Sequence, residues 1–448
     1  MNSWIKTHWK SFSNQPALAG RGGDIAYSDL VILWDEAVAD LKKLDLNTAT
    51  VFGLIGNYSA ATVVWMMVLE EAGHLIVPLL EGDEESSRKL SSAGATYLIF
   101  ANSRRWNIKH QSVAVHHHPF VLELIAKKQS GVVLFSSGTS GPAKLIVQNF
   151  SDLLNVHKTK RPHRLSILVV LAFDHIGGIN TLLETLSSGG LMVIPEDKSP
   201  AKILEAIERY KVTILPASPS FLNLLALSGL VTSEKIKSLH LITYGTEPMP
   251  EPLLERIRLT FPGKRLKQTF GTTETGILRT ESVGSGSNFF RFSDPDLKWK
   301  IIDNELWLKS TTQIKGYLNT QNQNFTEDGW FRTGDKVEVD STGNIRILGR
   351  MGDAINVGGN KLMPIEVESV ILEVPGVIDC RAFGVPNALL GQVVHADVVG
   401  SSDQNHESLR ASIRQFCRTR LPAYKVPVSI NFVTSIMGDR LKKSRTNQ

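Results

Sequence analysis

A run of small hydroxyl residues and glycines that ends at Lys144 has the composition of a phosphate-binding loop. Gly138 and Gly141 would let backbone N–H groups approach anionic oxygens closely, and Lys144 would add a positive charge. Further hydrogen-bond donors are the hydroxyls of Ser136, Ser137, Thr139 and Ser140. The run is not a Walker A loop, because Ala143 precedes the lysine and Leu145 follows it. By itself the pattern is compatible with a phosphate cradle and with an ordinary surface turn.

The segments around this loop alternate between strand and helix patterns. Residues 50–56 predict a buried strand, residues 59–72 a helix, and residues 75–79 another strand that Pro78 is expected to close. After the loop, residues 165–172 predict one continuous apolar strand. Such alternation indicates a parallel sheet built from βαβ units.

Composition limits the class of protein. The chain has 448 residues, of which 42% are hydrophobic, so we expect two or three domains. The chain has 49 basic and 44 acidic residues, and the basic residues form no long cluster. This pattern disfavours a nucleic-acid partner. Cys380 and Cys417 form no CxxC pair, and the histidine run at His116 has no partner pattern, so no disulfide framework or zinc site is indicated. With no signal core and no apolar run of roughly 20 residues, the sequence predicts a soluble, cytoplasmic protein without a membrane partner.

The loop that ends at Lys144 resembles the Ser-Gly-Thr-Thr-Gly-x-Pro-Lys-Gly signature of adenylate-forming enzymes. This superfamily contains acyl-CoA synthetases, peptide-synthetase adenylation domains and firefly luciferase. The resemblance covers about residues 20–448, because further motifs follow in the family's order. It implies an α/β fold with a large N-terminal domain of parallel-rich βαβ sheets (residues 1–349) and a small, mobile α+β C-terminal domain (residues 353–448). The two domains would be joined by a hinge at Gly352.

A second motif, which begins at Phe270, resembles the family's Tyr-Gly-x-Thr-Glu sequence. The resemblance implies that Phe270 stacks on adenine, that Thr273 donates to the α-phosphate, and that Glu274 binds Mg²⁺ through a carboxylate oxygen. The other nucleotide contacts that it implies are Gly271, Thr272, the glycine turn of Gly245, Thr246 and Glu247, the ribose partner Asp335, and Arg350 on ribose or phosphate. The segment that contains Tyr317 and Asn319 is similar to the family's Gly-Tyr-x-Asn and receives no role from the sequence.

The acid substrate has its own segment. Residues 173–178 are similar to the aromatic-x-His-x-x-Gly segment of acyl-activating members, which implies that His175, together with Gly276, lines the carboxylate pocket. Asp174 keeps an alternative open, because amino-acid-activating relatives use an aspartate near this place to hold an ammonium group. An aryl, a fatty and an amino acid therefore all stay open as substrates.

The C-terminal tail resembles the family's Gly-Lys-x-x-Arg motif, whose lysine grips the substrate carboxylate and the α-phosphate. Counting back from Arg445 selects Lys442 as the catalytic lysine, with Lys443 as the alternative because the glycine is missing. The other departures from the family's motifs are Ala143, Leu145, Gly352, Asn356 and Lys361.

The resemblance implies ATP-dependent conversion of a carboxylic acid to an acyl-adenylate with release of pyrophosphate, followed by thioester formation with CoA. Two anions must meet in the first step, so Mg²⁺, Lys144 and Lys442 would offset their repulsion. One alternative is transfer of the acyl group to the phosphopantetheine thiol of a separate carrier protein, since no carrier domain is expected within this chain. The other is a weakened, non-catalytic nucleotide-binding homologue, which the departures suggest.

Overall fold

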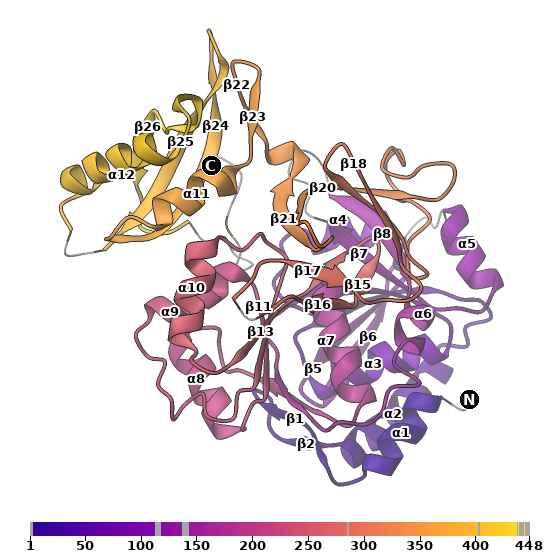
Figure 1. The fold of residues 1–448 in the computed structure, drawn as a ribbon. Coiled ribbons are helices and arrows are strands. Elements are labelled where there is room, and N and C mark those ends of the chain that lie inside the picture. Colours follow the sequence, from indigo (N-terminus) through magenta and orange to yellow (C-terminus); the bar gives the residue numbers. More distant parts are fainter. Residues whose placement is uncertain are drawn as a thin grey trace.

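The computed structural model describes residues 3–112, 118–136, 143–284, 286–401, 404–436, 438 and 443. Figure 1 shows a large body and, from β22 (Ile355–Val357) onward, a smaller body that meets the large one near α10 (Glu251–Thr260). The large body holds three main sheets and the small body one. This arrangement confirms the predicted fold class of a large α/β part followed by a small α+β part.

The sheet that carries the phosphate loop has the strand order β6-β5-β3-β4-β7-β8. Its pairs β5-β3, β3-β4 and β4-β7 are parallel, and only the edge strands β6 and β8 run antiparallel to their neighbours. The strands are β3 (Val51–Gly56), β4 (Leu75–Leu80), β5 (Tyr97–Asn102), β6 (Arg105–His110), β7 (Gly131–Ser136) and β8 (Lys144–Asn149).

A second sheet has the order β13-β12-β11-β9-β10-β1-β2 and is parallel except at its short last strand. Its strands are β1 (Pro16–Gly20), β2 (Ile25–Ala26), β9 (Ser166–Leu168), β10 (Leu191–Ile194), β11 (Ile214–Ala217), β12 (Leu241–Tyr244) and β13 (Arg265–Gln268).

Helices pack between and around these two sheets. One apolar core joins residues of both sheets to α1, α2, α3 and α7, with Trp9, Trp34 and Trp65 fully buried in it. The helices of the large body are α1 (Trp4–Phe12), α2 (Tyr27–Lys42), α3 (Ala60–Glu71), α4 (Ser86–Ala93), α5 (Pro119–Ala126), α6 (Phe150–Asn155), α7 (Ile176–Ser187), α8 (Pro200–Arg209), α9 (Pro219–Leu227) and α10 (Glu251–Thr260). Helix α3 begins where the side chain of Ser59 accepts a hydrogen bond from the backbone of Thr62, as its N-cap position requires.

The third sheet is antiparallel and follows a two-stranded ribbon that contains the second motif. The ribbon consists of β14 (Phe270–Thr272) and β15 (Gly276–Leu278). The sheet consists of β16 (Thr280–Ser282), β17 (Phe290–Phe292), β18 (Lys298–Ile302), β19 (Glu305–Lys309), β20 (Phe331–Val339) and β21 (Ile345–Arg350).

The small body has its own apolar core, centred on Ile371, Val398 and Ile413. It follows the short 3₁₀ helix Met351–Asp353, which contains Gly352. Its elements are β22 (Ile355–Val357), β23 (Asn360–Leu362), α11 (Pro364–Leu372), β24 (Val377–Asn387), β25 (Gly391–Gly400), α12 (His406–Arg420), the 3₁₀ helix Ala423–Lys425 and β26 (Ser429–Phe432).

Two predictions about strands are wrong. Pro78 does not close its strand, because β4 continues to Leu80 and Pro78 pairs with Leu54 of β3. Beyond Ile76, β4 no longer pairs with β7, so proline removes no ladder bond on that side. The apolar run 165–172 forms only the three-residue strand β9, since the neighbouring strands β10 and β11 are themselves only four residues long.

Candidate active site

The phosphate loop joins the two strands of a hairpin. Ser136 at the end of β7 pairs with Lys144 at the start of β8, so the two residues that flank the predicted phosphate loop lie side by side. The predicted phosphate contacts Ser137, Gly138, Thr139, Ser140 and Gly141 lie outside the described residues.

Tyr317 brings Lys144 and Glu274 together. The Lys144 ammonium lies 4.5 Å from the centroid of the Tyr317 ring, and the Tyr317 hydroxyl donates to Oε1 of Glu274 over 2.9 Å. Burial and the neighbouring Glu274 raise the pKa of the Tyr317 phenol, so the hydroxyl remains a donor. The first and second motifs therefore meet at one aromatic ring.

The segment around Tyr317 is fastened to the lysine strand by a side chain. Asn319 accepts a hydrogen bond from the Leu145 N–H over 2.7 Å and donates to the carbonyl of Ala143 over 2.9 Å. The sequence missed this role, although the Gly-Tyr-x-Asn motif was a signal that could have indicated it. Tyr317 and Asn319 are therefore positioning residues for Lys144.

Asp335 and Arg350 form the second half of the site. They pair across β20 and β21, and the Arg350 Nε lies 3.1 Å from Oδ1 of Asp335. Asp335 is only 6% exposed. Its burial raises the pKa of its carboxyl to about 6, against the opposing charge of Arg350 and with a further increase from Glu274. Since the charges of Glu274 and Arg350 both act on Asp335, these residues share one electrostatic environment.

The raised pKa of Asp335 predicts a pH dependence of nucleotide binding. A carboxylate must be ionised to accept two ribose hydroxyls, and this group is half ionised at about pH 6. We expect the KM for ATP to rise about tenfold between pH 7 and pH 5, because roughly a tenth of the carboxyl is ionised at one pH unit below its pKa. The KM is measured across this range beside Asp335→Asn, which should bind ATP weakly at every pH. A KM that rises equally in both proteins would contradict this role.

Two residues of the second motif have contacts within the protein. Thr272 is buried, and its Oγ1 accepts from the N–H groups of Glu274 (3.2 Å) and Thr275 (3.1 Å), which closes the turn that presents Glu274. The carbonyl of Thr273 accepts from Gln148 of β8 over 2.7 Å and fixes the motif to the lysine strand. These contacts position Glu274, while the α-phosphate contact of Thr273 stays a prediction.

Phe270 and Gly271 lie in the ribbon strand β14. Phe270 is 8% exposed, and its ring stacks on Phe290 at 6.1 Å and meets Phe292 edge-on at 5.8 Å. A side chain at Gly271 would collide with the carbonyl of Gly276 at 2.6 Å. Phe270 is thus part of the apolar core, and Gly271 allows close pairing of the ribbon strands. The adenine contact predicted for Phe270 stays a prediction.

The glycine turn after β12 lies beside the second motif. A Cβ at Gly245 would lie 2.7 Å from the carbonyl of Thr269, so only glycine allows this approach. Thr246 takes a positive φ of 72°. The Glu247 carboxylate accepts from the Ser220 hydroxyl over 2.8 Å and from the Lys443 N–H over 2.6 Å. Glu247 therefore connects the large body to the tail.

The tail separates the two candidate lysines. Lys442 lies outside the described residues. The Lys443 ammonium is buried in the small body, where it donates to the carbonyl of Cys380 over 2.7 Å and lies 3.0 Å from Oδ1 of Asp379. In this arrangement Lys443 has a structural role, which favours Lys442 as the lysine available to the substrate.

The acid segment lies at the start of α7. His175 precedes the first helical residue, and its Nε2 is 4.0 Å from Oδ1 of the buried Asp174. Gly276 takes a positive φ of 75°, and a Cβ there would approach Thr312 and Leu153 at 3.3 and 3.4 Å.

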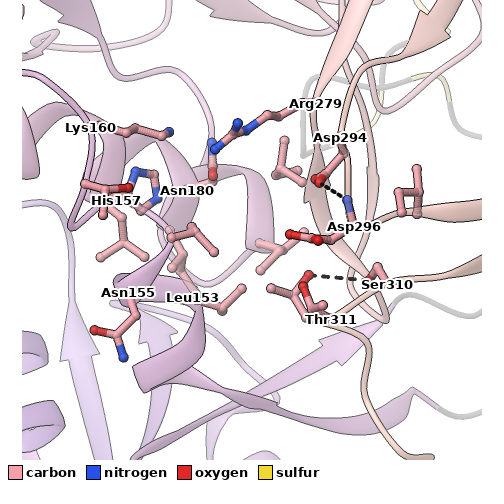
Figure 2. A pocket seen from close by; sticks show the side chains of 18 of the residues that line it. Leu153, Asn155, His157, Lys160, Asn180, Arg279, Asp294, Asp296, Ser310 and Thr311 are labelled. Atoms are coloured by element: carbon pink, nitrogen blue, oxygen red, sulfur yellow. Dashed lines mark hydrogen bonds between the residues drawn. The ribbon is translucent and has the colours of Figure 1, made fainter.

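Thr312 and Leu153 also line a pocket of about 270 Å³, which α6, α7, β15 and the loops at Asp294 and Ser310 enclose (Figure 2). Ile176 and Ile277, the direct neighbours of the two predicted substrate contacts His175 and Gly276, line it as well. The pocket is therefore the cavity next to the predicted acid site.

The donor set fits a magnesium ion that arrives with a nucleotide. Within the described residues no cluster of three or more His, Cys, Asp or Glu side chains could hold a metal. Mg²⁺ in such sites takes one or two carboxylates and fills its other positions with phosphate oxygens and water. Oε1 of Glu274 is oriented by Tyr317, and Oε2 has no hydrogen-bond partner in the described part of the chain.

Two family models match the chain. The model described as AMP-binding enzyme matches residues 5–317, and the AMP-binding enzyme C-terminal domain matches residues 366–446. The chain is 30% identical to the 2-succinylbenzoate–CoA ligase of Bacillus licheniformis over 353 residues, which cover 73% of this chain and 70% of that protein. It is 25% identical to the 2-succinylbenzoate–CoA ligase of Listeria monocytogenes, with 97% and 96% covered.

Solved structures agree on the fold. The anthranilate CoA ligase AuaEII in complex with anthranoyl-AMP superposes with a TM-score of 0.80 at 20% identity, over 98% of this chain and 95% of that one. The o-succinylbenzoate CoA synthetase of Bacillus subtilis in complex with its acyl-adenylate gives a TM-score of 0.75 at 21% identity, over 99% and 96%. In the part of the chain that the structure describes, no helix is long and apolar enough to cross a membrane.

Proposed function

Because the chain belongs to the family of AMP-binding enzymes, we propose that it activates a carboxylic acid as an acyl-adenylate and transfers the acyl group to CoA. The observation that carries the proposal is the convergence of Lys144, Glu274 and Tyr317 beside the Asp335–Arg350 pair. These five residues come from segments that are far apart in the sequence, between residues 144 and 350. Their chemistry matches a site for a nucleotide, a metal and an attacking carboxylate.

Each of these side chains has a task in the first step. Asp335 accepts the ribose hydroxyls, and Arg350 holds Asp335 in place and adds positive charge. Lys144 and Lys442 lower the repulsion between the carboxylate and the α-phosphate. A magnesium ion bound by Glu274 would neutralise phosphate charge. His175 and Gly276 directly precede Ile176 and Ile277, which line the pocket proposed for the acid.

CoA is favoured over a carrier protein as the acceptor, because both of the curated relatives described above are CoA ligases. Purified protein is incubated with ATP, a set of acids and either CoA or a holo-carrier protein, and thioester is measured by mass spectrometry. We expect acyl-CoA to form. Thioester formation on the carrier protein but not on CoA would instead identify the carrier protein as the acceptor. A cytoplasmic location stays a prediction.

The step with CoA gives Gly352 a testable role. In the present structure Gly352 has no positive φ, and a Cβ there would meet no atom within 4 Å, so alanine fits. If the small body swivels about this residue, the second arrangement can use backbone angles that favour glycine. We expect Gly352→Ala to form adenylate at the normal rate and thioester about 5- to 30-fold more slowly, as the 1–2 kcal/mol penalty of a left-handed L residue implies.

Single-turnover experiments separate these two steps, because adenylate and thioester are quantified in the same quenched samples. Equal rates for Gly352→Ala and the unchanged protein in both steps would remove Gly352 from the hinge. The swivel between the predicted domains, residues 1–349 and 353–448, would then have to occur at another residue.

A further inference from the structure

The pocket beside the acid site has an apolar floor and a charged outer end. Leu153, Ile179 and Leu183 contribute to the floor. Lys160 and Arg279 extend toward one another from opposite sides, with Asn180 between them (Figure 2). A purely apolar acid would match the floor but would bring its far end against these charges.

The two cations lie away from the reacting end of the pocket. Helix α7 begins next to His175 and advances about 10 Å between Ile176 and Leu183, at 1.5 Å per residue. Strand β15 begins at Gly276 and ends one residue before Arg279. Both elements thus lead from the predicted substrate contacts to the charged end.

Lys160 is largely neutralised by the protein. It forms an ion pair with Glu184, whose carboxylate also lies 3.2 Å from Nδ1 of His157 and 3.2 Å from Nε2 of His163. Burial opposes the ionisation of Glu184, but His157 and Lys160 outweigh it and hold the pKa of this carboxyl below its ordinary value. Glu184 is therefore an anion that is already engaged.

Arg279 has no such partner. Within the described residues its guanidinium forms no ion pair or side-chain hydrogen bond, although Asp294 and Asp296 line the same pocket. Oδ1 of Asp294 instead accepts the N–H of Asp296 over 3.3 Å. Burial lowers the pKa of His157, and the charges of Lys160 and Arg279 lower it further. Both cations therefore lie close enough to His157 to affect its charge.

We infer that the acid which this enzyme activates carries a second anionic group, a carboxylate in the first instance, which Arg279 binds at the outer end of the pocket. A guanidinium offers two parallel N–H donors that match a carboxylate. Because Glu184 already pairs with Lys160, the second anionic group would be bound by Arg279, which has no ion-pair partner among the described residues. The inference rests on the proposed function, because it assigns the pocket to the acid substrate, and it favours a compact diacid over a long fatty acid.

The test compares linear and ring-bearing dicarboxylic acids, each beside its monomethyl ester, in acid-dependent exchange of pyrophosphate into ATP. The unchanged protein should prefer a diacid. Arg279→Gln should lower kcat/KM for that diacid about 10- to 100-fold, the effect of losing hydrogen bonds to a charged group, and leave the monoester unaffected. The matched control is Arg291→Gln, which changes an exposed arginine paired with Glu281 outside the pocket and should alter neither value.

A binding measurement keeps this inference separate from the proposed function. The diacid should raise the melting temperature of the unchanged protein and of Arg291→Gln but not of Arg279→Gln. Exchange with monoacids together with an unchanged preference in Arg279→Gln would overturn the inference and leave the function intact. Arg279-dependent binding without exchange by any acid would support the diacid pocket and contradict the function. Absence of both binding and exchange would overturn the two together.

Discussion

Lys442→Ala is expected to slow adenylate formation by about 10²–10³-fold while ATP still binds. The reason is electrostatic, because a preorganised charge at a reacting anionic centre contributes roughly 3–4 kcal/mol to the barrier. The rate is measured as acid-dependent pyrophosphate release, and ATP binding by calorimetry. Near-normal pyrophosphate release by this variant would contradict the assignment.

The neighbouring lysine supplies the matched control. Lys443→Met keeps the length of the side chain but leaves Asp379 buried without its cation. Breaking a buried ion pair costs about 3–5 kcal/mol, so this variant should unfold at a lower temperature. Lys442→Ala should keep the normal melting temperature. The opposite pattern, with Lys443→Met stable and unable to release pyrophosphate, would make Lys443 the catalytic lysine.

Glu274→Gln is expected to lower the rate of adenylate formation by about 10²–10³-fold and to raise the magnesium concentration needed for half-maximal rate. Glutamine has nearly the same shape and can still accept the hydrogen bond from Tyr317, so the change removes mainly the charge of the metal-binding oxygen. Initial rates are measured across a magnesium titration at saturating ATP.

Glu281→Gln is the control for this substitution, because Glu281 is exposed and paired with Arg291. It should have a normal rate and a normal magnesium requirement, since exposed ion pairs contribute little. A Glu274→Gln enzyme with an unchanged magnesium requirement would show that the metal is held elsewhere.

Local patterns were sufficient to predict many elements of the fold. The helix at residues 59–72 was predictable because its apolar run follows Ser59, a residue type that caps helices. The strands at Val51 and Leu75 were predictable from their apolar runs, and they pair in parallel as expected. The length of β9 was not predictable, because it depends on where the neighbouring strands end.

The candidate site likewise contains residues that the sequence could predict and residues that it could not. The motifs identified Lys144, Glu274 and Asp335 as residue types suited to nucleotide chemistry, and the structure brings them near one another. The bridge through Tyr317 was not predictable, since it joins Ile146 and Glu274 through contacts that only the folded chain creates. Arg279 belongs to no recognisable motif, because its proposed role depends on the pocket that distant segments form around it.

Acid-dependent exchange of labelled pyrophosphate into ATP reports reversible adenylate formation without any thiol, so it isolates the proposed first step of the reaction. With a broad set of acids, including dicarboxylic acids, we expect exchange with at least one acid. This exchange should require magnesium and should be strongly reduced in Lys442→Ala and Glu274→Gln. Folded protein that binds ATP but exchanges no pyrophosphate with any of these acids would contradict the proposed function.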